Sequence, residues 1–445
     1  MYIYILLLHI AALFNEKAKK LVRGQAQTLK ELGGESGNKD TASYSSVGKA
    51  ANPRLQDRNH WSPLDSRCPT VGEELKGCVW VHAASVGEFE QARPVIERLK
   101  REQPNRKIVL TFFSPSGYEM RKDYPQVDKV LYLPFATRRN AERFVALLQP
   151  SMAIFVKYEF WPAYLKTLKK NNIPTHLIAA IFRKDQLFFK WYGWWYKRLL
   201  DCFTTLFVQD EASKELLEES NISTPRIVVA GDTRFDRVME VMKQRREIPA
   251  VMRFVEHELT PLHFEQEAPK VIVAGSTWPE DEELLARYVQ EHPKVKLILV
   301  PHEITDEHMH FIFNLFQGRF VRFSEASLNN VNTNEVLLID RMGMLSTLYR
   351  FGQVAYVGGG FGAGIHNTIE AAVYGKPVLF GPRYHNFREA ENLIEKGGGF
   401  AVHDYESFAA AMDDALAHHY EYGQIAGEYV QSELGATDKI YKELF

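Results

Sequence analysis

The chain has 445 residues, of which 45% are hydrophobic and 25% charged, and its formal net charge is -2. This composition is typical of a globular protein rather than a disordered one, and the near-neutral charge argues against nucleic acid as a partner. The length exceeds one ordinary hydrophobic core, so we expect two domains of roughly 150–200 residues each. The three cysteines lack metal-ligand spacing and fit a reducing compartment better than a disulfide framework.

The N-terminus differs from the rest of the chain. Residues 1–14 are apolar apart from His9, and a basic segment from Lys17 to Arg23 follows. The apolar run is shorter than the about 20 residues that a membrane-spanning helix needs. Its positive charges follow the run, whereas those of a signal peptide precede it. We therefore predict a membrane-anchor helix over residues 1–23, spanning or interfacial, with the protein body on the cytoplasmic side. A buried helix is the alternative.

The remaining chain divides into three parts. Residues 24–76 lack a sustained apolar period and are rich in Gly, Ser, Asn, Asp and Lys, which predicts a linker or poorly ordered insertion. Short β-type runs alternate with helical patterns over residues 77–245, and the alternation resumes within residues 246–445. This alternation indicates βαβ units and parallel sheets. We predict two Rossmann-like α/β domains facing each other across a cleft, with ligands at the carboxyl ends of the strands.

The sequence HAASVGE, from His82 to Glu88, directly follows a predicted strand and opens a helix. Ser85 and Glu88 have the spacing of a capping box, so one interpretation is a helix start with satisfied backbone donors. The other interpretation is catalytic. A carboxylate in the first turn of a helix is kept ionised by the helix dipole and is available as a general base. The spacing fits both interpretations.

A glycine-rich segment, VGGGFGAGIHNTIE over residues 357–370, also joins a predicted strand to a helix. Glycines let backbone amides approach a phosphate at a helix N-terminus, and Glu370 could accept hydrogen bonds from both ribose hydroxyls. Residues 358–363 fit a dinucleotide pattern only weakly, because no acidic residue ends the next strand. A tight turn followed by a helical glutamate is the alternative.

Other polar residues follow predicted strands. Ser276 and Thr277 end one strand of the second half and His302 follows the next, each explicable alone as a turn or cap. In the first half, Glu159 lies in YEFWP just after a strand, where it could be a first-turn acid. Residues 182–198 interleave aromatic and basic side chains, which fits a lipid headgroup interface or a core helix with basic ends.

At these motifs the chain resembles the Kdo transferases, the 3-deoxy-D-manno-octulosonic acid transferases of lipid A glycosylation. The motifs that carry the resemblance are, in order, HAASVGE, TFFSPSG, YEFWP, GDTRFD, VAGST, LVP, DRMG and YVGGGFGAGIHNTIEAAVYGKPVLFGP with its following HNF. The resemblance implies a GT-B fold and inverting transfer of Kdo from CMP-Kdo to a lipid A precursor, lipid IVA, in lipopolysaccharide biosynthesis. The implied location is the cytoplasmic face of the inner membrane, in contact with its lipids. No metal and no cofactor are expected.

The resemblance also implies roles for individual residues. Glu88 is the expected general base. The expected donor-binding residues are Ser276, Thr277, His302, Arg341, Met342, Gly343, Met344, Gly364, His366, Asn367 and Glu370. The expected acceptor-binding residues are Ser114, Ser116, Gly117, Glu159 and Arg183.

Three features depart from the family pattern. His302 occupies a position that is often Arg, so either His302 is protonated or another cation such as Arg383 compensates. Lys157 occupies a position that is often acidic, and residues 24–76 replace a shorter basic connection. Two other functions are considered: a GT-B transferase that uses a UDP-sugar, and a non-catalytic lipid-binding protein of the same fold. HAASVGE favours the Kdo transferase over the first, and Glu88 beside the nucleotide motifs disfavours the second.

Overall fold

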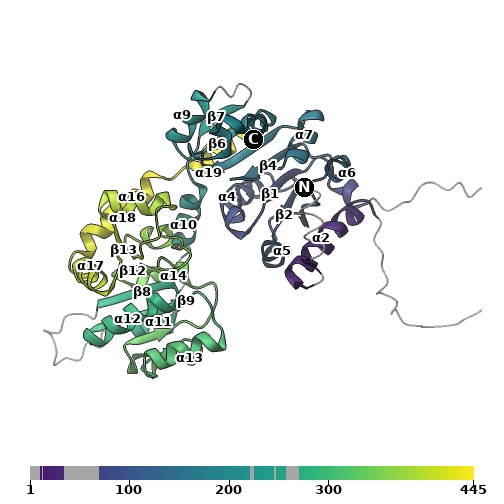
Figure 1. Cartoon of the computed structure of the whole chain (residues 1–445). Coiled ribbons are helices and arrows are strands. Elements are labelled where there is room, and N and C mark those ends of the chain that lie inside the picture. The colour runs from purple at the N-terminus through teal and green to yellow at the C-terminus, as the bar shows by residue number, and fades with distance from the viewer. Residues whose placement is uncertain (1–10, 13, 35–69, 221–224, 245–246, 257–269) are drawn as a thin grey trace, which may run out of the picture. The chain divides into compact units, whose positions relative to one another are not determined.

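The computed structural model describes residues 11–12, 14–34, 70–220, 225–244, 247–256 and 270–445. The chain forms two compact units. Unit 1 comprises Met1–Thr233 and Thr437–Phe445, and unit 2 comprises Arg234–Ala436. Helices and strands alternate along both units, as the sequence pattern predicts (Figure 1).

Unit 1 is built on a parallel sheet that has seven strands within the described residues, in the order β3-β2-β1-β4-β5-β6-β7. The strands are β1 (Val79–Ala83), β2 (Ile108–Phe112), β3 (Lys129–Tyr132), β4 (Met152–Val156), β5 (Thr175–Ala180), β6 (Thr205–Val208) and β7 (Arg226–Val229). All five residues of β1 and of β2 are buried. Continuous apolar runs of this kind are typical of parallel strands that are covered on both faces.

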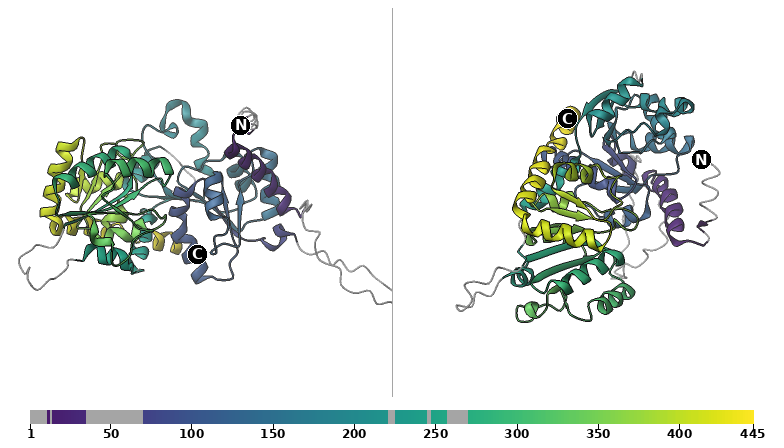
Figure 2. Two further views of the ribbon diagram at one scale, coloured as in Figure 1. Left: turned by 90° about the horizontal axis from the view of Figure 1, so that it is seen from below. Right: turned by 60° about the vertical axis from the view of Figure 1, so that its left-hand side comes forward.

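Helices cover both faces of this sheet (Figure 2). They are α2 (Glu16–Leu32), α3 (Val71–Glu74), α4 (Val86–Glu102), α5 (Pro115–Arg121), α6 (Arg138–Leu148), α7 (Pro162–Lys170), α8 (Trp194–Lys197), α9 (Glu211–Glu219) and α19 (Ala436–Leu444), with short 3-10 turns η1 (Leu187–Phe189), η2 (Trp191–Gly193) and η3 (Leu200–Cys202). Successive residues of β1 contribute to different cores: Trp80 packs with α6 and α7, whereas Val79 and Val81 pack with α4. This is the two-residue period of a strand.

Unit 2 repeats the plan with another parallel sheet, seven-stranded in the described part of the chain, in the order β10-β11-β9-β8-β12-β13-β14. Its strands are β8 (Lys270–Thr277), β9 (Val295–Pro301), β10 (Val321–Arg322), β11 (Val336–Leu338), β12 (Val354–Val357), β13 (Val378–Phe380) and β14 (Gly399–Ala401). Its helices are α10 (Thr233–Lys243), α11 (Pro249–Val255), α12 (Pro279–Glu291), α13 (Asp306–Leu315), α14 (Leu345–Leu348), α15 (Ile369–Ala372), α16 (Arg388–Lys396), α17 (Tyr405–Ala417) and α18 (His419–Ser432), with η4 (Val331–Thr333) and η5 (Tyr349–Phe351).

The unit boundaries differ from the predicted domains of residues 77–245 and 246–445. Unit 2 begins at Arg234, and the last nine residues of the chain, Thr437–Phe445, belong to unit 1. There α19, yellow in Figure 1, lies beside β6 and β7. Arg226 at the start of β7 donates two hydrogen bonds to the carboxylate of Glu443 in α19. The last helix of the chain therefore belongs to the first unit.

The predicted linker over residues 24–76 begins too early, because α2 continues through Leu32. Leu29 and Leu32 are buried in the core of unit 1, and the Thr28 hydroxyl donates to the Tyr132 carbonyl at 3.0 Å. Figure 2 shows α2, in purple, along one side of unit 1. Gln27 and Lys30 lie on the exposed face of this amphipathic helix, whereas the polar residues Gln25 and Thr28 are buried. Residues 35–69 of the predicted linker lie outside the described residues.

About half of the predicted membrane anchor, residues 1–10 and 13, also lies outside the described residues. Among the helices that the structure does describe, none combines the length and the apolar character needed to cross a membrane. The anchor over residues 1–23 stays a prediction.

Candidate active site

The carboxyl ends of β1, β2 and β4, which are neighbours in the sheet of unit 1, gather several of the predicted residues. Glu88 lies in the first turn of α4, and its Oε2 accepts hydrogen bonds from the Ser85 backbone N–H, at 3.1 Å, and from the Ser85 hydroxyl. Both features of the predicted capping box are present. Within the described residues, Oε1 of the half-buried Glu88 accepts no hydrogen bond. The cap therefore leaves one carboxylate oxygen available for chemistry.

The turn after β2 lies beside this cap. The Ser114 backbone N–H donates to the Ala84 carbonyl at 2.7 Å, and the hydroxyls of Ser114 and Ser116 lie 2.7 Å apart. Gly117 is buried, and a Cβ there would lie 2.6 Å from the Phe112 ring. Close packing of α5 on β2 thus accounts for Gly117. The two serines are the polar groups of this turn that could contact a ligand.

Glu159 follows β4, where the chain turns sharply. Lys157 has a φ of +62°, an uncommon left-handed conformation for a non-glycine residue. Glu159 Oε2 accepts a hydrogen bond from Trp161 Nε1 at 2.6 Å and lies 3.3 Å from Nε2 of the fully buried His82. The structure thereby brings Glu159 back to β1, the strand that precedes Glu88. Arg183 is exposed and lies after β5. Burial raises the pKa of Tyr158, and the positive charge of Arg183 partly opposes this rise.

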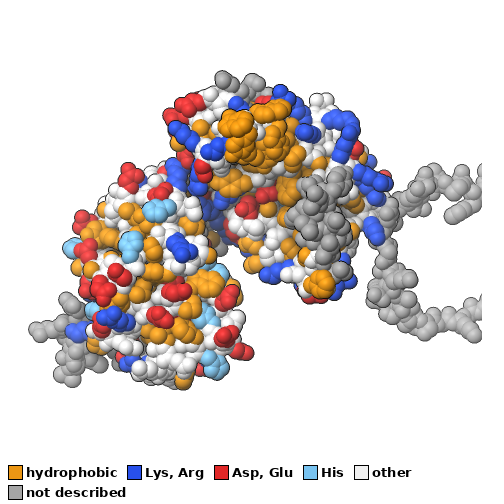
Figure 3. All heavy atoms as spheres, viewed as in Figure 1, with side chains coloured by type: hydrophobic (Ala, Val, Ile, Leu, Met, Phe, Trp, Pro, Cys, Tyr) orange, Lys and Arg blue, Asp and Glu red, His pale blue; other side chains and the backbone are white. Residues whose placement is uncertain are grey.

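The aromatic and basic segment divides into a buried and an exposed side. Phe188 is buried and packs against Phe160, 4.7 Å between ring centroids. Trp191 is 90% exposed, and three neighbouring aromatic side chains are more than half exposed, namely Tyr192, Trp194 and Trp195. In the space-filling view a cluster of hydrophobic side chains lies on unit 1 with basic side chains around it (Figure 3). A core helix with basic ends describes this segment only in part, because Phe182 and Phe188 are buried whereas the rings of Trp191, Tyr192, Trp194 and Trp195 are exposed.

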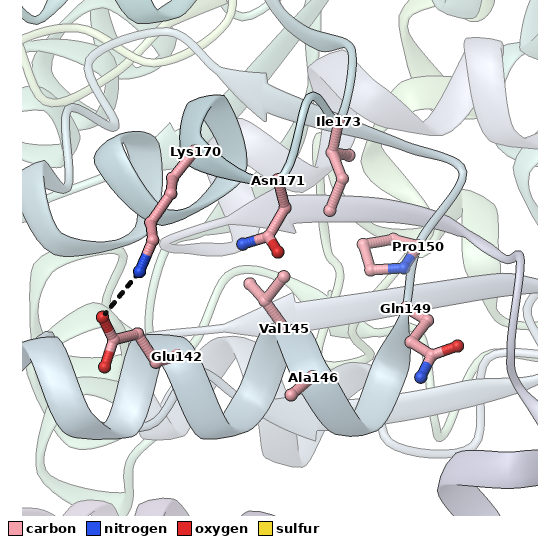
Figure 4. Close-up of a pocket in the computed structure, with 8 residues that line it drawn as sticks. All are labelled: Glu142, Val145, Ala146, Gln149, Pro150, Lys170, Asn171 and Ile173. Carbon is pink, nitrogen blue, oxygen red and sulfur yellow. Dashed lines mark ion pairs between the residues drawn. The ribbon is translucent and has the colours of Figure 1, made fainter.

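A separate pocket of about 560 Å³ lies between α6 and α7 (Figure 4). Its lining residues are Glu142, Val145, Ala146, Gln149, Pro150, Lys170, Asn171 and Ile173. Pro150 precedes β4 and Ile173 precedes β5, so the pocket lies at the amino ends of these strands. It is therefore on the edge of the sheet opposite to Glu88 and Glu159 and contains none of the predicted residues.

In unit 2 the carboxyl ends of β9, β8 and β12 are adjacent and bear most of the predicted donor residues. Ser276 has a φ of +54° at a bulge near the end of β8. Thr277 is fully buried, and its hydroxyl donates to Glu282 Oε1 at 2.8 Å. Glu282 Oε2 in turn lies 2.9 Å from His308 Nε2. Thr277 is thus a support for the strand end, and Ser276 is the hydroxyl available to a ligand.

Three rings connect these strand ends. His302 stacks on Trp278, with ring centroids 4.8 Å apart, and on His366, with centroids 4.5 Å apart. Trp278 Nε1 donates to His366 Nε2 at 3.4 Å. Burial, with a smaller contribution from His302, lowers the pKa of His366 to about 4. His366 is therefore neutral at pH 7, and it accepts the hydrogen bond from Trp278.

The glycine-rich segment forms a compact turn that does not open directly into a helix, since α15 begins only at Ile369. The backbone N–H groups of Gly364 and His366, two of the predicted donor-binding residues, donate to the carbonyls of Gly359 and Gly358. A Cβ at Gly360 would lie 2.6 Å from the Gly381 backbone. Close approach of neighbouring strand ends therefore explains these glycines in part, and the two amides are already used within the turn.

The remaining predicted donor residues lie around this turn. Asn367 Nδ2 donates to Glu370 Oε1 at 3.0 Å, so the two side chains are held together. The predicted donor-binding residues 341–344 form a largely exposed turn just before α14. Leu345 of α14 packs directly on Gly275, next to Ser276. Arg383 Nη1 donates to the Gly362 carbonyl at 2.6 Å, which holds this cation against the glycine-rich turn.

Several residues that organise these edges were not predicted. In unit 1 they are His82 and Trp161, and in unit 2 they are Trp278, Asp281, Glu282 and His308. The acidic first turn after Trp278-Pro279 was a visible helix-start signal. Trp161 and Glu282 also have partners close in the sequence, Glu159 and Thr277, whereas the pairs of His82 with Glu159, Trp278 with His366 and Asp281 with Gly359 join distant segments that no local pattern could connect.

Comparison with known proteins gives one consistent family. A family model described as 3-deoxy-D-manno-octulosonic-acid transferase (kdotransferase) matches residues 54–237. The 3-deoxy-D-manno-octulosonic acid transferase of Aquifex aeolicus is 29% identical over 352 residues, which are 78% of this chain and 88% of that protein. The enzyme of the same name from Haemophilus influenzae is 28% identical over 350 residues, 76% of this chain and 78% of that protein.

Among solved structures, UDP-GlcNAc 2-epimerase from Neisseria meningitidis bound to UDP-GlcNAc has a TM-score of 0.57 at 18% identity and covers 82% of this chain and 98% of its own. At this identity the likeness concerns the fold alone. Together with the two parallel α/β units it confirms the predicted GT-B fold class. The resemblance found in the sequence motifs is also confirmed, since the Kdo transferase family model matches residues 54–237 and relatives named as Kdo transferases match over most of the chain.

Proposed function

We propose that the chain transfers Kdo from CMP-Kdo to a sugar hydroxyl of a lipid A precursor, lipid IVA, with inversion at the anomeric carbon and without a metal ion. The family model and the named relatives support the sugar and the reaction class. The structural observation that carries the proposal is the Glu88 carboxylate, held by Ser85 at the start of α4 with Oε1 unoccupied among the described residues.

In this proposal Glu88 is the general base. Oε1 takes the proton of the acceptor hydroxyl while the hydroxyl oxygen attacks the anomeric carbon of Kdo. The bond between that carbon and the CMP phosphate oxygen breaks, and CMP leaves as an anion. The N-terminal end of the α4 dipole stabilises the ionised form of Glu88 before the proton is taken. The hydrogen bonds from Ser85 fix the carboxylate so that only Oε1 is presented.

The donor is assigned to the carboxyl edge of the unit 2 sheet. The Ser276 hydroxyl and the Asn367 side chain are the proposed phosphate contacts, and Glu370 is the proposed ribose contact. Because the departing CMP is anionic, positive charge near it lowers the barrier. Arg383, tethered to the glycine-rich turn through the Gly362 carbonyl, supplies that charge where His302 replaces the arginine that the family resemblance leads one to expect.

The acceptor and membrane assignments rest on unit 1. Ser114, Ser116 and Glu159 lie at the same sheet edge as Glu88 and are the proposed contacts to the acceptor sugar. The exposed aromatic rings of residues 191–195 are the proposed contact with inner-membrane lipids, since amphipathic rings beside basic side chains favour the headgroup region. This patch explains how a protein could approach a lipid-linked acceptor from the cytoplasmic face.

The test is product formation by the purified full chain, given CMP-Kdo and a detergent-dispersed tetra-acylated lipid A precursor with a chelator present. We expect wild type to add Kdo and Glu88→Gln to lose about a hundredfold or more of the rate, as for loss of a general base. Glu102→Gln, at the far end of the same helix in an exposed ion pair with Arg98, is the matched control and should keep its activity.

Each outcome has a defined meaning. An active Glu88→Gln variant would remove the base assignment. If the wild-type protein is inactive with CMP-Kdo but consumes a UDP-sugar, the chain is a GT-B transferase that uses a UDP-sugar donor. A protein that binds the lipid and consumes neither donor would be a non-catalytic member of the family. Loss of activity caused by the chelator would contradict metal independence.

A further inference from the structure

His82 is a buried polar residue that has no role in the proposed transfer reaction. It is the fourth residue of β1 and has no solvent exposure. Its Nδ1 lies 3.1 Å from the Thr111 carbonyl oxygen and 2.9 Å from the Thr111 hydroxyl, while its Nε2 lies 3.3 Å from Glu159 Oε2. Both nitrogens of the ring are therefore engaged, one by the neighbouring strand and one by the proposed acceptor site.

The contact with Glu159 determines whether Nε2 carries a proton. An ionised carboxylate can only accept, so Nε2 must carry a hydrogen to interact favourably with Oε2. On the other side of the ring, the Thr111 hydroxyl can either donate to Nδ1 or accept from it, while it also accepts from Trp80 Nε1 at 2.9 Å. The contacts with β2 therefore fit a ring that has its hydrogen on Nε2.

Nε2 and the carboxylate oxygen of Glu159 could not attract each other if both had only lone pairs. Their contact requires a proton between them. Glu159 Oε2 also accepts a 2.6 Å hydrogen bond from Trp161 Nε1, and a donor so close favours the ionised carboxylate. The proton therefore belongs on Nε2, which donates it to the carboxylate in a buried setting.

Two donors thus converge on one oxygen of Glu159. His82 and Trp161 both engage Oε2, and the left-handed turn at Lys157 directs the chain so that this contact forms. In the described part of the chain, Oε1 accepts no hydrogen bond. The side chain is 14% exposed, so this oxygen is fixed in place and still accessible. An oriented carboxylate oxygen with an open lone pair is suited to accept a hydrogen bond from a hydroxyl group.

We propose that His82 is a positioning residue for the acceptor: by pairing with Glu159 Oε2 it orients Oε1 to accept a hydrogen bond from a hydroxyl group of the acceptor sugar. The inference rests on the proposed function for the identity of the acceptor. The pairing of His82 with Glu159 does not depend on that identity. His82 acts only through Glu159 and takes no part in the transfer of the acceptor proton to Glu88.

The pairing is tested without activity, by nitrogen-15 NMR of the full chain labelled at histidine. The His82 signals are identified by their loss in His82→Gln. We expect Nε2 of wild-type His82 to carry a proton, and the His82 signals to shift in Glu159→Gln, where a neutral amide replaces the carboxylate. An Nε2 without a proton in wild type, or identical His82 signals in wild type and Glu159→Gln, would overturn the proposal.

The positioning role is tested by two substitutions of different reach. The Gln amide reaches the place of Nε2 and can donate to Glu159, whereas the shorter Asn amide replaces only Nδ1 and leaves Glu159 without this donor. We expect His82→Asn to raise the acceptor KM about tenfold to a hundredfold, as for a lost hydrogen bond to a charged group. The donor KM should change much less, and His82→Gln should recover most of the loss. His176→Asn, at another buried histidine of this sheet, is the control.

The outcomes separate the two proposals. If His82→Asn and His82→Gln lose activity equally while thermal melting shows both folded, the positioning role is wrong. A larger effect on the donor KM than on the acceptor KM would also contradict it. If wild type is inactive with CMP-Kdo and the lipid acceptor, the proposed function fails. In that case the NMR comparison still decides whether His82 and Glu159 are paired.

Discussion

The Asp281 carboxylate accepts a hydrogen bond from the Gly359 backbone N–H at 2.8 Å, although 78 positions separate the two residues. The same side chain accepts from the Tyr356 hydroxyl at 2.7 Å and from the Trp278 backbone N–H at 3.0 Å. Gly359 has a φ of +91°, a left-handed conformation that favours glycine. Asp281 therefore ties the start of α12 to the glycine-rich turn that borders the candidate donor site.

This relationship predicts different effects for two substitutions. Asp281→Ala leaves three donors without their acceptor in a buried place and should destabilise the protein by about 2–4 kcal/mol. Asp281→Asn should cost less than about 1 kcal/mol. Its carbonyl oxygen can serve both backbone N–H groups, and its amide can donate to the Tyr356 hydroxyl. Urea unfolding of the full chain measures both. Equal stability of Asp281→Ala and wild type would show that the glycine-rich turn keeps its conformation without Asp281.

Glu370 gives a prediction for the donor side. Asn367 holds its carboxylate near the glycine-rich turn, and the proposed partners are the ribose hydroxyls. Glu370→Ala should raise the donor KM by about tenfold or more, as expected when a hydrogen bond to a charged group is lost, and change the acceptor KM little. Glu391→Ala, on α16 and about half exposed, is the control. If the acceptor KM rises more than the donor KM, the nucleotide site lies elsewhere.

The exposed aromatic patch gives a prediction for membrane binding. Replacing Trp191 and Trp194 by Ser removes two amphipathic rings, so binding to vesicles of anionic phospholipid should weaken by about tenfold or more. Stability should change little, since these rings are 90% and 59% exposed. Tyr420→Ser, an 84% exposed aromatic in unit 2, should bind vesicles like wild type. Flotation with vesicles measures the difference, and unchanged flotation would remove the patch from the membrane proposal.

Much of the fold could be predicted from the sequence, because its signals are local. The runs VWVHA and KVIVAGST are continuous apolar strands with polar residues at their carboxyl ends, and the structure places them as β1 and β8. The capping box of Ser85 and Glu88 was predicted in the same way. In α2 the signal was hidden, since a narrow apolar face is diluted by many exposed polar residues.

The supports of the candidate site could not be predicted, since they depend on pairs brought together by the sheets. His82 and Glu159 are 77 positions apart, and His308 reaches Glu282 from the following helix. Thr277 was expected to face the donor but donates its hydroxyl inward to Glu282. Spacing shows which residues follow a strand. It does not show which of these side chains point away from the sheet edge toward a ligand and which stabilise the edge itself.

His176 is a buried residue of β5 in the sheet of unit 1. Burial lowers the pKa of His176 to about 4, from an ordinary 6.5, and its Nδ1 has no hydrogen-bond partner within the described residues. Between these pH values the unfolded chain binds a proton at this position that the folded chain does not bind. His176 therefore makes stability rise with pH through this window and fall as the pH is lowered from 6.5 to about 4.

The loss amounts to at most about 3 kcal/mol for this one residue. His176→Leu removes the proton site and also the unpartnered nitrogen, so it should be as stable as wild type or more stable at pH 7. It should also lose less stability than wild type between pH 6.5 and 4. Urea unfolding followed by tryptophan fluorescence across this range measures both curves. Parallel curves for the two proteins would mean that His176 becomes protonated within the folded sheet.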